Sequence, residues 1–433
     1  MSTVAEHPIH RRHLSCGLDV AIERSHSLRS CGLMLRLPGG FGADPAGEAG
    51  EGAATLLAEL VQRGAGERSS RAFADAVDSL GASTSVSAGP ESTLIEASGL
   101  GEHLPELLPL LVDVARCPRI EDEEVEPTRS LALQELQSVN DVPPTLGSIE
   151  FRRLLAPPPF NRSGMGHPVG LAVWDGPSLR ARWSERTGPK GALLCVAGGI
   201  VPEEVFELVE GLVEGWEGEC LAQSAEATPI RGRSHLTHPA AQTFMMIGSD
   251  GVTGRDSDLI ALKMLSYILG GSSSSRLFTE VREKRGLCYG IGMGVVASPT
   301  HGFTQIYAAS TPARAPETLK QIREELGKAS RGVTRDEFEI ARTGFKSSIV
   351  FSGESSAARA GSLAVDIVRG IDPRSLAEIA AEVDALTHDT LNEVAAKRFD
   401  AAWLDGLTVV TVGPEDPFAK ADIGWPGAML SSP

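Results

Sequence analysis

The sequence predicts an α+β fold made of two homologous α/β-roll domains, each an antiparallel sheet packed against helices. Two observations carry this prediction. Strand-like and helix-like hydrophobic periods alternate along the chain, and two pairs of segments recur at nearly the same spacing. A chain of 433 residues is long enough for two or three domains. The repeat favours two halves of about 215 residues each.

The repeat rests on two pairs of segments. Residues 192–199 (ALLCVAGG) and 407–413 (LTVVTVG) both read as apolar strands that end in glycine. Residues 120–125 (IEDEEV) and 333–338 (VTRDEF) both begin a helix with acidic side chains in its first turn, where the helix dipole favours them. The offsets of the two pairs are 215 and 213 residues. A duplication accounts for both.

Each half mixes the two hydrophobic periods. Residues 31–37 (CGLMLRL) place alternate apolar side chains on one face of a strand, whereas residues 52–61 are apolar at helical spacing. Residues 83–88 and 92–97 read as paired strands around a Gly-Pro turn. The stretch after residue 220 is poor in large apolar side chains, as linkers are. We therefore expect an N-terminal domain over residues 1–220, a linker over 221–234 and a C-terminal domain over 235–433.

Composition narrows the class of protein. The net charge of −17 argues against nucleic acid as a partner, because that binding depends on clustered Lys and Arg. No apolar run of 18 residues occurs, so we expect no membrane span. The six cysteines contain no C-x-x-C pair, which in a chain of this size indicates reduced thiols and a cytoplasmic protein.

One segment of the second half combines several signals. An apolar helical stretch ends at Gly270 and Gly271, and four serines follow. A second helix is expected over residues 275–285, ended by Gly286, with a glycine-rich strand beginning at Tyr289. A Gly/Ser loop before a helix can bind phosphate, but the G-K-[ST] ending that this function needs is absent.

These residues carry a resemblance to a family. Residues 270–292 (GGSSSSRLFTEVREKRGLCYGIG) resemble the C-terminal-half signature of the pitrilysin/insulinase-type zinc peptidases, in their processing-peptidase-like bacterial branch. Residues 14–23, 79–89, 102–136 and 193–205 resemble further segments of the same family. The resemblance extends over about 400 residues.

The resemblance also shows what is missing. The family binds zinc through H-x-x-E-H on a first-half helix, with a distant Glu as the third protein ligand. The matching positions hold Thr55, Ala58 and Glu59, so both imidazoles and the general base are absent. Glu135 stands at the third-ligand position, either as a relic ligand or as an ordinary helical Glu. We expect no metal and no cofactor in this chain.

A second set of family residues is present. Family members use an Arg and a Tyr seven residues apart to hold substrate near the scissile bond, and Arg282 and Tyr289 have this spacing. Their N–H and O–H groups suit a peptide carbonyl that becomes anionic. The alternative is a surface Arg and a half-buried strand Tyr. Gly270 and Gly271 would begin a mobile loop nearby.

The resemblance implies that this chain is the zinc-lacking subunit of a heterodimeric peptidase. Its expected partner is a homologous chain with intact H-x-x-E-H, which would carry the zinc, and its expected substrate is a peptide. The alternative is a non-catalytic scaffold or peptide-binding homologue, like the core proteins of respiratory complexes. An independent peptidase with another metal arrangement would need ligands that the sequence does not offer.

Overall fold

The computed structural model describes residues 8–419 together with Trp425 and Leu430. These residues form two compact units, and each unit contains a segment from the other half of the sequence. Unit 1 comprises residues 1–136, 164–224 and 351–376, and unit 2 comprises residues 137–163, 225–350 and 377–433. The division near residue 224 falls inside the expected linker. The expected continuous halves differ from these units in the exchanged segments 137–163 and 351–376.

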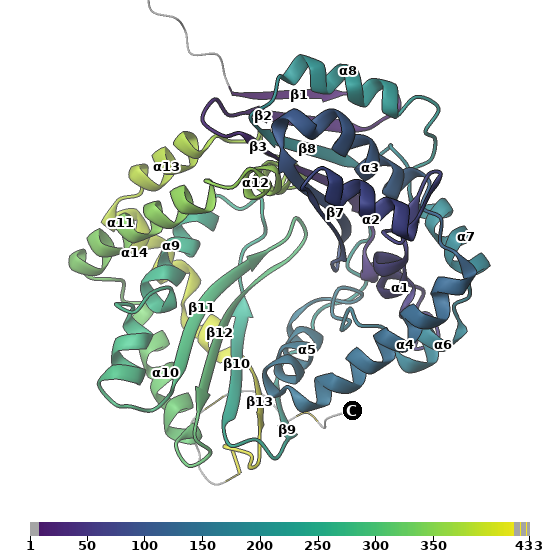
Figure 1. Ribbon diagram of the computed structural model, residues 1–433. Helices are drawn as coiled ribbons and strands as arrows, with labels where there is room; N and C mark the ends of the chain where they lie inside the picture. Colours follow the sequence, from purple (N-terminus) through teal and green to yellow (C-terminus); the bar gives the residue numbers. More distant parts are fainter. Residues whose placement is uncertain (1–7, 420–424, 426–429, 431–433) are drawn as a thin grey trace, which may run out of the picture. The chain divides into compact units, whose positions relative to one another are not determined.

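Unit 1 contains a six-stranded sheet in the order β1-β2-β8-β3-β7-β6 (Figure 1). Its strands are β1 (Ile9–His13), β2 (Asp19–Arg24), β3 (Ser30–Pro38), β6 (Ser83–Ala88), β7 (Ser92–Leu100) and β8 (Leu193–Gly198), with a small ribbon of β4 (Gly64–Ala65) and β5 (Arg68–Ser69). Its helices are α1 (Ala53–Leu60), α2 (Ser70–Ser79), α3 (Leu104–Arg116), α4 (Asp122–Ser138, extending two residues into unit 2), α6 (Pro168–Val173), α7 (Gly176–Arg186), α8 (Pro202–Leu212) and α12 (Ser356–Val368).

Unit 2 contains a five-stranded sheet in the order β11-β12-β10-β13-β9. Its strands are β9 (Arg233–Thr237), β10 (Thr243–Asp250), β11 (Gly290–Ala297), β12 (Gly302–Ser310) and β13 (Thr408–Gly413). Its helices are α5 (Pro143–Leu155), α9 (Leu259–Gly270), the π-helical turn η4 (Phe278–Glu283), α10 (Ala315–Ala329), α11 (Arg335–Ser352), α13 (Leu376–Ala385), α14 (His388–Arg398) and α15 (Ala401–Asp405). The last residues of α11 and the first of α13 belong to the segment assigned to unit 1.

The two sheets confirm the predicted fold class of homologous α+β domains. Read from opposite ends, β2-β8-β3-β7-β6 and β9-β13-β10-β12-β11 have the same pairings. They are not purely antiparallel, because β2 pairs with β8 and β9 pairs with β13 in parallel. A parallel pair requires a long crossover between its strands, which in each unit runs through the other strands and helices.

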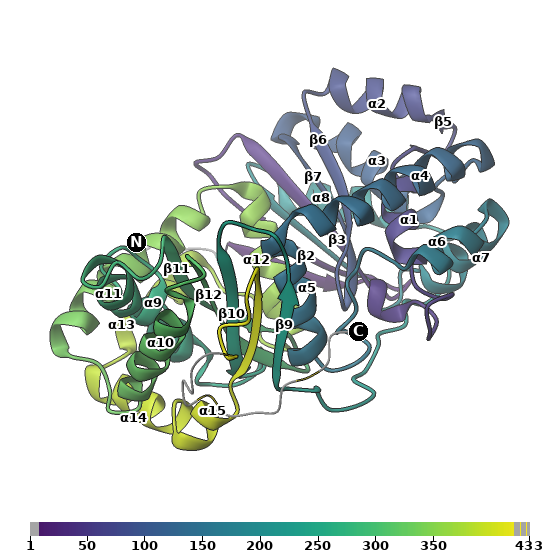
Figure 2. The same cartoon turned by 90° about the horizontal axis from the view of Figure 1, so that it is seen from below.

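Each sheet packs helices on both faces. In unit 1 the face with Leu33 and Leu35 packs against the main helical core, and α12 covers the opposite face through Ala360 and Leu363. In unit 2, α5 lies against β10 and β13 (Figure 2). Both strands β8 and β13 are buried along their whole length, as expected for strands with helices on both faces.

Candidate functional site

Arg282 and Tyr289 lie at the two ends of a tightly bonded turn in unit 2. The sequence predicts a helix over residues 275–285, and the structure has a helical segment over residues 276–283, in which Phe278–Glu283 form the π-helical turn η4. Within it the N–H of Lys284 donates to the carbonyl of Thr279, five residues back. Gly286, with φ of +60°, then ends the helical path, a conformation that suits glycine.

The turn packs into the core through the buried side chains of Val281, Leu287 and Cys288. The hydroxyl of Thr318, on α10, donates to the carbonyl of Leu287 at 3.1 Å, and the N–H of Tyr289 donates to Ala309 on β12 at 2.8 Å. Burial raises the pKa of the Cys288 thiol to about 11, so this thiol is protonated at neutral pH. The segment therefore presents Arg282 and Tyr289 from a rigid base.

The side chains of Arg282 and Tyr289 are directed away from that base. Tyr289 is 61% exposed, more than the half-buried strand tyrosine of the alternative interpretation. Arg282 is exposed, and its guanidinium carbon lies 4.4 Å from the ring centroid of Phe278. Neither side chain makes a hydrogen bond or an ion pair with another residue in the described part of the chain. Their donors are available to a ligand.

The expected loop at Gly270 and Gly271 begins one residue later than predicted. Gly270 is the last residue of α9 and is buried against β11. A Cβ atom at Gly270 would lie 2.5 Å from the backbone nitrogen of Met293, closer than packed atoms approach. Gly270 therefore allows α9 to approach β11, and the serine segment follows Gly271, with Ser273 and Ser274 exposed and Ser275 buried.

The three zinc-motif positions lie on α1 in unit 1, and their chemistry does not suit a metal ion. Thr55 is half-buried and its hydroxyl donates to the carbonyl of Gly164 at 3.2 Å. Ala58 is buried and offers only a methyl group, whereas Glu59 is exposed. Catalytic zinc takes nitrogen, thiolate or carboxylate ligands, usually three from the protein. One carboxylate on this helix does not make such a set.

Glu135 does not complete a zinc site. It is an exposed residue near the end of α4. Among the described residues, no group of three or more His, Cys, Asp and Glu side chains is arranged to hold a metal ion. With Thr55 and Glu59 at the two His positions, the residues at the family's zinc positions do not supply the ligands that zinc takes, and we assign no metal-dependent step to this chain.

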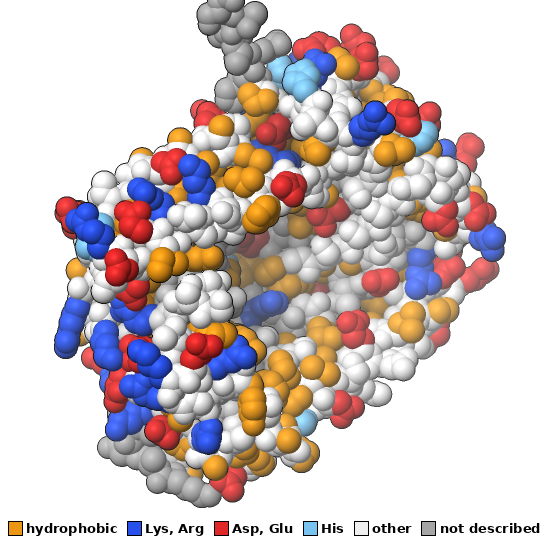
Figure 3. Space-filling view, turned by 60° about the vertical axis from the view of Figure 1, so that its left-hand side comes forward, with side chains coloured by type: hydrophobic (Ala, Val, Ile, Leu, Met, Phe, Trp, Pro, Cys, Tyr) orange, Lys and Arg blue, Asp and Glu red, His pale blue; other side chains and the backbone are white. Residues whose placement is uncertain are grey.

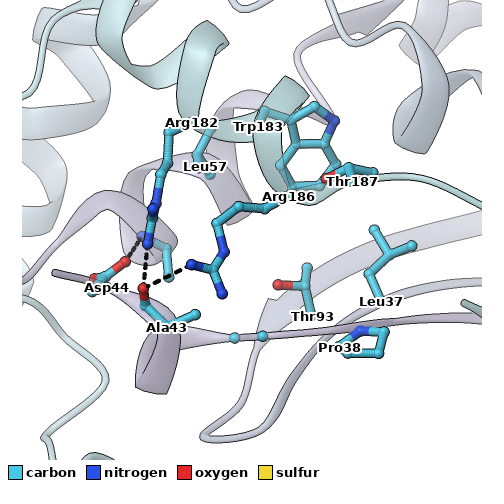
Figure 4. A pocket seen from close by; sticks show the side chains of 13 residues that line it. Leu37, Pro38, Ala43, Asp44, Leu57, Thr93, Arg182, Trp183, Arg186 and Thr187 are labelled. Atoms are coloured by element: carbon cyan, nitrogen blue, oxygen red, sulfur yellow. Dashed lines mark hydrogen bonds between the residues drawn. The ribbon is translucent and has the colours of Figure 1, made fainter. Parts of the chain in front are cut away.

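A small cavity of about 40 Å³ lies beside α1 (Figure 4). The guanidiniums of Arg182 and Arg186, on α7, both donate to the carbonyl of Ala43 in its wall. The neighbouring carboxylate of Asp44 accepts hydrogen bonds from the N–H groups of Gly52, at 2.8 Å, and Ala54, at 3.1 Å. These polar groups hold the start of α1, a role that sequence reasoning missed because Asp44 lies nine residues before the first residue of the helix.

Sequence reasoning also missed Tyr307 on β12, which is 45% exposed although its neighbours Ile306 and Ala308 are fully buried. The alternation of residues between the two faces of the strand over 303–309 was the available signal, because it places Tyr307 on the face opposite the apolar core.

The surface drawn in Figure 3 mixes charges of both signs, with Lys and Arg side chains interspersed among Asp and Glu. Among the described helices, none is both long enough and apolar enough to cross a lipid bilayer.

Sequence comparisons match the chain to one peptidase family. Residues 19–154 match the profile described as "Insulinase (Peptidase family M16)", and residues 177–345 match the profile described as "Peptidase M16 inactive domain". Together the two matches cover more than two thirds of the sequence. The chain belongs to the M16 (insulinase) peptidase family, as its resemblance to pitrilysin- and insulinase-type peptidases predicted.

Relatives of similar length support this assignment. The chain is 28% identical over 413 residues to an uncharacterized zinc protease of Mycobacterium leprae, with 91% of each chain covered. It is 24% identical to an uncharacterized zinc protease of Bacillus subtilis, over 88% of this chain and 94% of that one.

Solved structures share the fold. A peptidase M16 inactive domain from Pseudomonas fluorescens superposes with a TM-score of 0.85 at 22% identity, covering 94% of this chain and 98% of that chain. A protease from Helicobacter pylori gives a TM-score of 0.82 at 20% identity, covering 93% and 99%. At these identities the likeness concerns the fold.

Proposed function

We propose that this chain is the zinc-lacking subunit of a two-chain M16 metallopeptidase that cleaves peptides. The observation that carries the proposal is the state of Arg282 and Tyr289. Both side chains are exposed on a rigid turn, and neither donates to another described residue. Because the backbone of the turn is already fixed, only side-chain entropy is lost when these exposed donors bind a ligand.

In the proposed complex, Arg282 and Tyr289 act on a peptide held at the zinc site of a homologous partner with an intact H-x-x-E-H motif. The guanidinium of Arg282 donates up to five hydrogen bonds and remains charged, and the phenol of Tyr289 donates one. Both donors would bind the scissile carbonyl oxygen, which becomes negatively charged in the tetrahedral intermediate. The partner supplies the metal, since Thr55, Ala58 and Glu59 do not fit one.

We also propose that the complex works in the cytoplasm. Four of the six cysteines, Cys31, Cys195, Cys220 and Cys288, are buried as free thiols. Such thiols persist in a reducing compartment.

The test is kinetic. The chain is coexpressed with an H-x-x-E-H homologue from the same organism, and the purified complex cleaves a pool of internally quenched, unstructured peptides. We expect Arg282→Ala and Tyr289→Phe each to lower kcat by about 10²–10³ while the complex still assembles. Matched controls are Arg285→Ala, which removes a guanidinium bound to Glu280, and Tyr267→Phe on α9. Both controls should retain wild-type turnover.

Wild-type turnover in both the Arg282 and the Tyr289 variants would overturn the proposed role. If the chain forms a stable homodimer that does not bind the zinc-bearing homologue, the scaffold or peptide-binding function replaces the peptidase function.

A further inference from the structure

Tyr307 lies over an open part of the unit 2 sheet. Residues Gly290, Gly292 and Gly294 of β11 share one face of the strand, and Ile291 and Met293 point to the opposite, helix-covered face. In the adjacent strand, Tyr307 pairs directly with Gly292. The glycines leave β11 without side chains on the face beside the tyrosine ring, whereas Met246 of β10 pairs with Tyr307 on its other side.

The ring of Tyr307 leans along β11 toward Tyr289. A Cβ atom placed on Gly290 would lie 2.4 Å from the phenol oxygen of Tyr307, so this oxygen sits directly over Gly290. Gly290 is the residue that follows Tyr289 in the chain. The absence of a side chain at Gly290 thus allows the Tyr307 hydroxyl to occupy its position.

Other elements leave Tyr307 accessible. On the same face of the sheet, α5 packs against β10 and β13, where it buries Phe151 and Leu154 against Val410 and Val412. Beyond this contact Tyr307 remains 45% exposed. Its hydroxyl makes no hydrogen bond to a residue in the described ranges. An exposed tyrosine with a free hydroxyl and a fixed ring is well suited to peptide recognition, since few rotamers are lost on binding.

We infer that Tyr307 is a third substrate-binding residue, whose hydroxyl donates a hydrogen bond to a backbone carbonyl of an extended peptide. This inference rests on the proposed function, because it places the peptide next to Arg282 and Tyr289. Tyr307 contacts the peptide away from the reacting carbonyl. Its hydrogen bond is therefore equally strong in the ground state and the transition state, and it affects KM rather than kcat.

The first test uses the two-chain complex and the quenched peptides. Tyr307→Phe should raise KM by about three- to tenfold, the range expected for one neutral hydrogen bond, with kcat within twofold of wild type. Gly290→Ala keeps the phenol but displaces its oxygen, and should raise KM to a similar extent. Gly294→Ala is the matched control, since its Cβ would meet Gln305 at an ordinary distance of 3.9 Å.

The double variant Gly290→Ala/Tyr307→Phe separates an effect through the Tyr307 hydroxyl from a nonspecific effect on the β11 strand. If Gly290→Ala acts through the Tyr307 hydroxyl, it should add nothing to KM once Tyr307 is already Phe. A further rise in the double variant would show that Gly290→Ala acts through the strand, and an unchanged KM in Tyr307→Phe would overturn the inference.

The second test does not depend on catalysis. The chain contains three tyrosines, so 3-fluorotyrosine labelling gives three ¹⁹F signals, each assigned by a Tyr→Phe variant. On titration of the isolated chain with the peptide pool, the Tyr307 signal should shift while that of Tyr267 stays in place. A Tyr307 signal unaffected at saturating peptide would contradict the inference.

The two proposals can fail separately. Loss of kcat in the Arg282 and Tyr289 variants with an unchanged Tyr307→Phe enzyme would leave the proposed function intact and remove only Tyr307. Wild-type kinetics in the variants of all three residues would remove the proposed function itself.

Discussion

Arg359 and Glu23 are 336 positions apart in the sequence and form a salt bridge of 2.7 Å inside unit 1. Arg359 lies on α12 and Glu23 on β2, and their side chains are only 5% and 12% exposed. The same guanidinium also donates to the hydroxyl of Ser362 and to the carbonyl of Arg374. This set of bonds attaches α12 to the sheet, beside the apolar contacts of Ala360 and Leu363.

Removal of Arg359 should therefore destabilise unit 1. Arg359→Met leaves the Glu23 carboxylate buried without its partner, which we expect to cost about 3–5 kcal/mol in the free energy of unfolding. Denaturant titration followed by circular dichroism measures the change. Arg71→Ala is the matched control, because its i,i+4 pair with Asp75 is exposed, and it should change stability by less than about 0.5 kcal/mol. A loss of equal size in both variants would contradict the role of burial.

Gly270→Ala and Gly211→Ala should change stability in opposite directions. The new methyl group at Gly270 would collide with the backbone of Met293 and force α9 away from β11, at a cost of about 1–3 kcal/mol. Gly211, the second-to-last residue of α8, has open space around its Cβ position, so Ala should stabilise the helix by up to about 0.5–1 kcal/mol. Thermal unfolding of the two variants measures both changes. Destabilisation by Gly211→Ala would contradict the open space at this position.

The acid sensitivity of unit 2 should depend on Glu337. Burial alone would raise the pKa of Glu337, but hydrogen bonds from Arg276 at 2.8 and 2.9 Å, together with the N–H of Thr334, hold the pKa below its usual value. A lowered pKa contributes stability that is present above the unfolded-state pKa of about 4.3 and is lost as the pH falls through the folded-state pKa.

Glu337→Gln should consequently lose about 1.5–3 kcal/mol at pH 7 and show a shallower decrease in stability below pH 4.3. Denaturant titrations between pH 3 and pH 7 provide the comparison. Asp75→Asn, at the exposed pair with Arg71, should follow the wild-type curve. Parallel curves for wild type and Glu337→Gln would refute the prediction.

Cysteine labelling should distinguish the buried thiols from the accessible ones. Cys288 is part of the buried base of the turn, and burial raises its pKa to about 11, as it also does for Cys31. At pH 8 both should remain protonated and resist iodoacetamide. Cys16 is partly exposed, so native labelling should concentrate there; Cys117 is exposed, but partial burial and the neighbouring Asp113 carboxylate raise its pKa and slow its labelling. Peptide mapping by mass spectrometry identifies the sites, and rapid modification of Cys288 would contradict the structure.

The sequence was sufficient for the features that depend on local pattern. The glycine that ends each of β8 and β13, and the acidic starts of α4 and α11, revealed the repeat because strand ends and helix starts carry distinct residue types. Gly286 likewise marked the turn between Arg282 and Tyr289, because only a residue tolerant of positive φ fits there. The loss of both His ligands, at Thr55 and Glu59, and of the general base, at Ala58, could be recognised directly from the motif spacing.

The sequence did not predict which sheet each helix packs against. The apolar side chains of α5 and α12 show that each helix packs on a surface, but not that this surface belongs to the sheet of the other half. The exposure of Tyr307 depends on how far α5 extends over the sheet, and a strand pattern contains no such information. Gly270 was assigned to a loop because glycine often ends a helix, whereas here it permits a close helix–strand contact.

The exchange of helices has a consequence for the order in which the protein can fold during synthesis. The sheet of unit 1 takes its strands from residues 9–198, yet the helix that covers its second face spans Ser356–Val368. While the ribosome adds the intervening residues, the apolar face containing Ala21 and Cys195 is not yet covered by α12. Unit 1 is therefore completed only after most of the chain has been synthesised. A chain interrupted before residue 356 leaves that apolar face accessible to other proteins.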